Sequence, residues 1–353
     1  MNEQETIQPA ESRWIGTANH GFAAYAQEEL KRAFGSVKSS VLVPGEVLLL
    51  TLPAEAEQVL HRLQAQPLMF LRHIQPVRYD LVLEQLTEQE QQPLDSLAAL
   101  LLKREELYGK TIALHVRKTG DAETDDSNAS ELRHQLEERL AELHAEFTVQ
   151  QPELIVSVLW TADRLYAGIS KPEDNLSDWN GGAIRFQREE GQISRAKFKL
   201  LEAEKVFGID FTAFRRALDV GAAPGGWTSF LLERGLQVTA VDPAKMHPSL
   251  QNHPQLKTVR RNAADVKFSA GEFDLLVCDM SWSPKLTARL VIDLLDAVQP
   301  GGTVIVTVKL MHKKPLAVIR EVMESFEEAR LQIQRAKQLF HNRDEITLYM
   351  VKY

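Results

Sequence analysis

The chain has 353 residues, more than a single hydrophobic core of ordinary size accommodates, so two or three domains are expected. The composition is globular, with 44% hydrophobic and 25% charged residues, and no apolar run is long enough to predict a membrane-spanning helix. A membrane partner is therefore not expected. The single cysteine, Cys278, excludes an internal disulfide, and the ten histidines show no metal-ligand spacing, so no metal site is expected either.

Charge is distributed unevenly along the chain. Residues 1–190 hold 18 Lys and Arg against 31 Asp and Glu, a net charge of −13, whereas residues 191–353 hold 23 against 18, a net charge of +5. The basic part could face a polyanion such as RNA, although ordinary variation in surface charge would give the same counts. The polar, acidic start of the chain is unlike a signal peptide, which predicts a cytoplasmic protein.

Three segments of the chain carry no chemical motif. Residues 1–12 are expected to be a disordered leader, and residues 13–80 an N-terminal α/β module with a helix in FAAYAQEELKRAF. Residues 173–192 carry Pro, Asn and paired Gly without periodicity, which predicts a domain linker.

Residues 81–172 show the pattern of a small α/β module. TIALHVRK (111–118) predicts a strand, NASELRHQLEERLAEL (128–143) a helix, and ELIVSVLW (153–160) with RLYAGI (164–169) a hairpin. The stretch LHVRKTG, the helix after it and QPELIVSVLWTADRLYAGIS resemble the THUMP domain, a module of RNA-modifying enzymes. The resemblance implies an RNA-binding function for this part, and any other small α/β domain is the alternative.

From residue 193 to 353 strands and helices alternate. A helix in SRAKFKLLEAEKVFG, capped by Ser194, precedes the first strand, and the alternation predicts a mostly parallel sheet covered on both faces. LQIQRAKQLF and EITLYMVKY are joined by only HNRD, so they must pair as an antiparallel hairpin. The predicted fold class is α/β, a Rossmann-like domain preceded by two α+β modules.

A glycine-rich loop predicts a nucleoside cofactor. ALDVGAAPGGWTSFLL places Gly221, Gly225 and Gly226 between a strand and a helix, where the backbone can approach a ligand closely. The next strand, QVTAV, is followed by Asp242, whose carboxylate can accept hydrogen bonds from both ribose hydroxyls of an adenosine group.

The loop favours S-adenosylmethionine among nucleoside cofactors. The dinucleotide pattern GxGxxG fails at Ala223, and Asp219 would repel a pyrophosphate but suits the positively charged amino acid end of S-adenosylmethionine. A dinucleotide, or a glycine turn with a purely structural role, is the alternative. The predicted cofactor-binding residues are Ser194, Asp219, Gly221, Ala223, Pro224, Gly225, Gly226, Trp227, Asp242, Asp265 and Asp279.

Charged residues mark the strand ends of the same domain. Asp279 ends FDLLVCD, Lys309 ends TVIVTVK, and Glu345 begins the reversed strand EITLYMV, so the three are expected at one edge of the sheet. Lys199, on the helix before the first strand, could reach that edge from the flank.

In this order Lys199, Asp279, Lys309 and Glu345 resemble the Lys-Asp-Lys-Glu tetrad of the FtsJ-type ribose 2′-O-methyltransferases. The signatures SRAKFKL, DVGAAPGGWT, VCDM, VKL and NRDEITLYMV extend the resemblance over residues 194–353. It implies S-adenosylmethionine-dependent 2′-O-methylation of RNA with Lys309 as general base. The likeness extends to members that join a THUMP-containing front half to this domain, which implies a nucleotide of 23S ribosomal RNA in the large subunit as substrate.

A ribose 2′-hydroxyl is a weak nucleophile, so the reaction needs a base. Lys309 qualifies when neutral, and partial burial beside the Lys199 cation would lower its pKa, whereas Asp279 and Glu345 would raise it. Lys313, Lys314, Arg195 and Lys197, with His312 and His341, are candidate RNA contacts or a solvated face.

The alternative functions are a non-catalytic RNA-binding or ribosome-assembly protein, a methyltransferase of another RNA such as tRNA, and a small-molecule or protein methyltransferase. A monomer that binds no DNA is expected.

Overall fold

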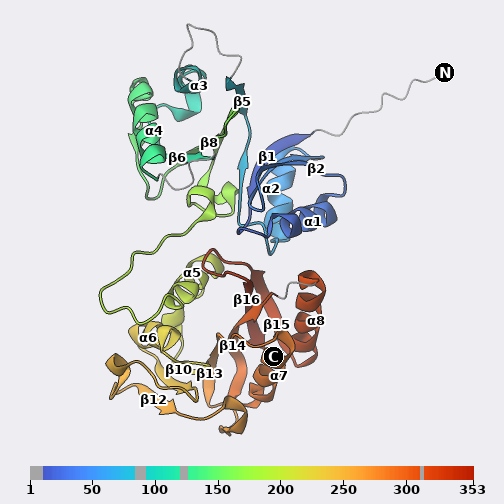
Figure 1. Cartoon of the computed structure of the whole chain (residues 1–353), viewed down its shortest axis with the longest axis vertical. Helices are drawn as coiled ribbons and strands as arrows, with labels where there is room; N and C mark the ends of the chain where they lie inside the picture. The colour runs from blue at the N-terminus through green and yellow to red at the C-terminus, as the bar shows by residue number, and fades with distance from the viewer. Residues whose placement is uncertain (1–10, 84–92, 120–125, 311–313) are drawn as a thin grey trace, which may run out of the picture. The chain divides into compact units, whose positions relative to one another are not determined.

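The computed structural model describes residues 11–83, 93–119, 126–310 and 314–353, and the chain divides into two compact units, 1–184 and 185–353 (Figure 1). The boundary between the units lies inside the predicted linker of residues 173–192. Across the described ranges, no helix has the length and apolarity needed to span a bilayer. The division of the first unit into an N-terminal and a THUMP-like domain stays a prediction.

The first unit begins with a four-stranded antiparallel sheet in the order β2-β3-β1-β4. Its elements are β1 Ser12–Thr17, α1 Ala23–Phe34, β2 Lys38–Val43, β3 Val47–Leu52, α2 Ala56–Ala65 and β4 His73–Pro76. The predicted helix is α1. The leader predicted for residues 1–12 is too long, because Ser12 already pairs with Leu52 across β1 and β3; residues 1–10 lie outside the described ranges.

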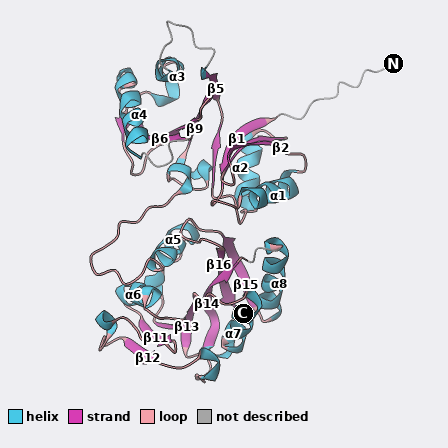
Figure 2. Cartoon of the chain, viewed as in Figure 1, coloured by secondary structure: helices cyan, strands magenta, loops and turns pink. Residues whose placement is uncertain are grey.

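A five-stranded mixed sheet follows in the first unit, in the order β5-β9-β8-β6-β7. Figure 2 shows the strands in magenta and the helices α3 and α4 in cyan. Its elements are β5 Tyr79–Val82, α3 Pro93–Leu101, β6 Thr111–Lys118, α4 Asp126–Arg139, β7 Glu146–Phe147, β8 Leu154–Trp160 and β9 Arg164–Ser170. The strand predicted at 111–118 and the β8–β9 hairpin are confirmed. The predicted helix of residues 128–143 ends early, at Arg139, and α3 and β7 carried no signal that predicted them.

The second unit is a seven-stranded sheet in the order β12-β11-β10-β13-β14-β16-β15. Strands β10 to β14 are parallel, and β16 runs antiparallel to both of its neighbours, which confirms the mostly parallel sheet and its terminal hairpin. The strands are β10 Arg216–Val220, β11 Gln237–Val241, β12 Leu256–Val259, β13 Phe273–Cys278, β14 Val298–Lys309, β15 Leu331–Lys337 and β16 Glu345–Lys352.

Four helices cover this sheet, α5 Lys197–Phe207, α6 Gly226–Glu233, α7 Pro284–Asp293 and α8 Pro315–Glu328. Figure 1 shows α5 and α6 on one side of the sheet and α7 and α8 on the other. Leu200 of α5 and Phe230 of α6 share one apolar cluster with alternate strand residues such as Val277 and Ile305. The helix predicted directly after Ser194 begins only at Lys197, because the Ser194 hydroxyl accepts the Ala196 N–H in a preceding turn.

Candidate active site

The predicted charged residues gather at the carboxyl edge of the parallel strands. Asp279 directly follows β13, Lys309 is the last residue of β14, and Glu345 is the first residue of β16. Lys309 lies directly opposite Glu345 in the antiparallel register, which places their Cβ atoms about 5 Å apart. The reversal of β16 therefore returns a carboxylate to the edge where β13 and β14 end.

Strand alternation decides which face these side chains share. Ile305 packs in the cluster beneath α5 and α6, so Thr307 and Lys309, two and four residues later, are on the same face. Helix α5 covers this face and carries Lys199, whose Nζ lies 2.8 and 3.1 Å from the two oxygens of Asp279. The same Nζ is 2.6 Å from Oε2 of Glu345, so one ammonium joins a strand end to the hairpin.

The electrostatics of this cluster hold Lys199 in its charged form. The side chains of Lys199, Asp279 and Glu345 are only 15, 17 and 18% exposed. Burial by itself would lower the pKa of Lys199, but the charges and hydrogen bonds of the two carboxylates outweigh burial and raise that pKa. Lys199 is therefore a fixed cation at the edge of the sheet.

Lys309 differs from Lys199 in its surroundings. Its side chain is exposed, and no described residue lies within ion-pair distance of its ammonium. The partial burial that the sequence left open for Lys309 is therefore not found. The physical reason is that Lys309 closes β14 at the rim of the sheet, one residue beyond the buried Val308.

Thr307 belongs to the cluster although sequence reasoning missed it. Its hydroxyl donates a 2.6 Å hydrogen bond to Oδ1 of Asp279, and the residue is almost fully buried. The position two residues before Lys309 in the same strand was the available signal, because alternate residues share a face. Thr307 and Lys199 together fix the orientation of the Asp279 carboxylate.

The glycine-rich loop lies beside this cluster. Gly221 has a φ of +75°, and a Cβ added to it would lie 2.5 Å from Cγ of Met280, so only glycine fits under the segment that follows Asp279. The Ala223 N–H donates to Oδ2 of Asp242 at 3.1 Å, which ties the loop to the end of β11. The peptide bond between Ala223 and Pro224 is cis.

The start of α6 is packed against the segment that precedes α5. A Cβ added to Gly226 would lie 2.9 Å from Cβ of Ser194, so Ser194 lies beside the loop, and its contact with the cofactor stays a prediction. Trp227 is 3% exposed, and its Nε1 donates to the Ala196 carbonyl at 2.9 Å. Trp227 is thus a core residue that ties α6 to this segment.

Asp219 does not present an open carboxylate to the loop, contrary to the prediction. It is 1% exposed and accepts a 2.5 Å hydrogen bond from the Thr228 hydroxyl of α6. Burial raises the pKa of Asp219 to about 7. The reason is strand alternation, since Asp219 follows the buried Ala217 on the face that α6 covers.

The remaining predicted contacts fall into separate groups. Asp265 is exposed on a short turn, Ala263–Asp265, after β12. The suggestion that Lys197 contacts RNA is wrong, because its buried ammonium lies 2.9 Å from Glu189 and 2.8 Å from Glu233. The rings of Phe186 and Phe198 pack against His341. Arg195 and Lys314 are exposed, whereas His312 and Lys313 lie outside the described residues.

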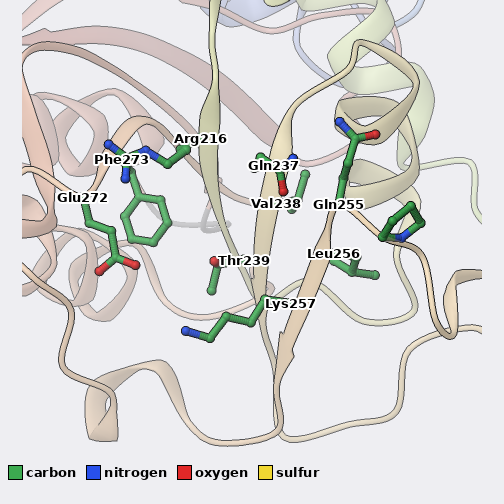
Figure 3. Close-up of a pocket in the computed structure, with 10 residues that line it drawn as sticks. Arg216, Gln237, Val238, Thr239, Gln255, Leu256, Lys257, Glu272 and Phe273 are labelled. Carbon is green, nitrogen blue, oxygen red and sulfur yellow. The ribbon is translucent and has the colours of Figure 1, made fainter.

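A pocket in the second unit lies on the opposite edge of the sheet (Figure 3). Its lining includes Arg216, Gln237, Leu256 and Phe273, which are the first residues of β10 to β13. Ligands of open α/β sheets bind beyond the carboxyl ends of the strands. The pocket therefore has no part in the charged cluster, which is built on the other ends of the same strands.

The second unit matches a known family. Residues 192–341 match the family model described as FtsJ-like methyltransferase. Together with the strand order, this match confirms the predicted Rossmann-like methyltransferase fold of the unit. The THUMP assignment in the first unit stays a prediction.

The chain is also similar to proteins named Ribosomal RNA large subunit methyltransferase M. It is 33% identical to the one from Laribacter hongkongensis over 54% of this chain and 56% of that protein. It is 36% identical to the one from Psychromonas ingrahamii over 52% of this chain and 53% of that protein. The chain thus spans about half the length of these curated relatives. The crystal structure of TrmN from Thermus thermophilus has a TM-score of 0.38 and 16% identity, over 97% of this chain and all of that one.

Proposed function

We propose that the chain is an S-adenosylmethionine-dependent methyltransferase that methylates the 2′-oxygen of a ribose in large-subunit ribosomal RNA. The observation that carries the proposal is the ionic cluster of Lys199, Asp279 and Glu345, with Lys309 in register beside it. The FtsJ-like match and the names of the relatives support ribosomal RNA as the substrate.

The residues at the carboxyl edge fit the proposed cofactor. The glycine loop offers backbone close to the strand ends, since added Cβ atoms at Gly221 and Gly225 would overlap Met280 and Leu250. Asp242 follows β11, where a carboxylate can accept hydrogen bonds from ribose hydroxyls. When bound, S-adenosylmethionine supplies an electrophilic methyl group on a sulfonium.

In the proposed reaction, Lys309 acts as the general base. Its neutral amine takes the proton of the ribose 2′-hydroxyl while the 2′-oxygen forms a bond to the methyl carbon and the carbon–sulfur bond breaks. Lys199 lies on the same face of the sheet, with its ammonium between the carboxylates of Asp279 and Glu345.

Replacement of the base tests the chemical role. The Lys309→Ala variant is expected to lose methyl transfer by about 10²- to 10⁴-fold, because a positioned base contributes this much. Its affinity for S-adenosylmethionine, measured by calorimetry, should be nearly that of the parent. Lys257→Ala is the matched control, since Lys257 is an exposed lysine at the opposite edge of the sheet. Retained transfer in Lys309→Ala would refute the assignment.

The same variant identifies the substrate in cells. RNA from cells that lack the protein is compared, by mass spectrometry of ribose methylation, with RNA from cells complemented by the parent or by Lys309→Ala. The proposal expects one ribose methyl of 23S RNA to return with the parent only. A methyl that returns in tRNA instead would favour the alternative substrate, and no change in any RNA would contradict ribose methylation.

A further inference from the structure

Trp282 is an exposed tryptophan in the segment that joins β13 to α7. Its exposed fraction is 42%, whereas Trp14 and Trp227 are buried and the other two described tryptophans are partly buried. Tryptophan is among the largest apolar side chains, and leaving it in water forgoes a substantial burial free energy. The exposure of Trp282 therefore indicates that its indole contacts a binding partner.

The location of Trp282 ties it to the proposed active site. It follows Asp279 by three residues, so the two Cα atoms are at most about 11 Å apart along the chain. Met280, between them, packs over Gly221 of the glycine loop. The segment thus leaves the sheet at the carboxyl edge, where Asp279 and Lys309 lie.

The indole N–H and the ring face of Trp282 are available for contact with a ligand. No described residue gives it a hydrogen bond or a ring contact, whereas the Trp227 indole donates to the Ala196 carbonyl. A nucleobase supplies a flat face on which an aromatic side chain stacks, and it does so in single-stranded RNA, where bases can be splayed out.

Exposed cations lie at the same edge of the sheet as Trp282, together with exposed Leu286 in the first turn of α7. Exposed Lys309 closes β14 at the same edge, and the first turns of α7 expose Lys285 and Arg289. Lys285 is paired with Glu321 at 2.6 Å and is still 68% exposed. Aromatic side chains interleaved with cations are typical of surfaces that bind single-stranded nucleic acid.

We propose that Trp282 stacks on a nucleobase of the RNA beside the ribose that is methylated. The inference rests on the proposed function and adds to it the residue that positions the strand. A ribose hydroxyl is the same on every nucleotide, so contacts to neighbouring bases are needed to select one. Stacking by Trp282 supplies such a contact at the edge of the sheet where Lys309 lies.

The test compares three substitutions of Trp282 by steady-state methylation of 23S RNA from cells that lack the protein. Trp282→Ala is expected to raise the KM for RNA by about 5- to 150-fold, the range that loss of one base stack produces, with a smaller change in kcat. Trp282→Phe should retain most of the affinity because it keeps an aromatic face. Trp282→Leu should behave like Trp282→Ala, because it is apolar without such a face.

Two outcomes would overturn the stacking proposal. An unchanged KM in Trp282→Ala would show that the indole contacts no base, and rescue by Leu as complete as by Phe would indicate an apolar contact, as a protein partner makes. The affinity of each variant for S-adenosylmethionine reports that the second unit is folded. Failure of the proposed function is distinguishable, because the parent protein itself would then methylate no RNA.

Discussion

The two lysines of the cluster have different electrostatic surroundings. Lys199 is held between Asp279 and Glu345, which raise its pKa, so it cannot readily give up a proton. Lys309 is exposed and has no carboxylate partner among the described residues, which leaves its amine available to a substrate hydroxyl. The proposed division of roles, with Lys199 as the fixed cation and Lys309 as the base, follows from this difference.

Asp219 makes a residue-scale prediction about stability and pH. Folding raises its pKa from 3.8 to about 7, so its contribution to stability is complete below pH 3.8 and is lost as pH rises through about 7. The Asp219→Asn variant should remove this loss and be more stable than the parent at pH 8, by on the order of a few kcal/mol. Urea unfolding at pH 5 and pH 8 measures the difference, and an equal pH dependence of both proteins would contradict it.

Helix α5 holds the terminal hairpin at two points. Besides Lys199, which reaches Glu345, it carries Glu202, which is 2% exposed and lies one turn later on the helix. The Glu202 carboxylate accepts the backbone N–H groups of Phe340 and His341 at 2.7 and 2.9 Å. These residues precede Glu345 in the connection between β15 and β16, so α5 fixes the place where β16 begins.

This arrangement predicts the effect of changing Glu202. Glu202→Ala removes the acceptor of two backbone N–H groups and is expected to lower the free energy of unfolding by about 1–3 kcal/mol. If the connection positions Glu345, kcat should fall while the affinity for S-adenosylmethionine changes little. Glu204→Ala is the control on the same helix, since Glu204 pairs with Arg234 of the α6 end instead. Equal kcat values in the two variants would contradict a positioning role.

At the scale of the whole chain, the two units differ in the sign of their net charge. Residues 185–353 hold 25 Lys and Arg against 20 Asp and Glu, and residues 1–184 hold 16 against 29. The second unit contains the whole seven-stranded sheet and the charged cluster, with its own apolar core. We therefore expect it to carry the chemistry by itself.

A fragment of residues 185–353 tests this expectation. It should unfold cooperatively and bind S-adenosylmethionine as tightly as the full chain, because every residue assigned to the cofactor lies within it. Its KM for 23S RNA should rise, since the first unit is predicted to bind RNA. Calorimetry and steady-state methylation check the two statements, and a KM equal to that of the full chain would argue against an RNA-binding role of the first unit.

Features that depend on local pattern could be predicted from the order of residues alone. Apolar runs that alternate with helices predicted the parallel sheet, and the short predicted connection HNRD indicated the reversed last strand. The observed connection, residues 338–344, is longer than predicted because β15 ends at Lys337. Because parallel strands end at one edge, the order of residues along the chain was enough to assign Asp279, Lys309 and Glu345 to that edge. The glycine loop was also visible, because its residues are contiguous.

The burial of the charged side chains and the identity of their partners became visible only in the folded chain. Lys199 meets Glu345 across 146 positions of sequence, and Thr307 meets Asp279 across 28. The burial of Asp219 under α6, the pairing of Lys197 with Glu189 and the exposure of Lys309 were likewise not visible in the sequence. Periodicity fixes which face of a strand a residue is on, but the charge state of a side chain depends on which distant elements cover that face.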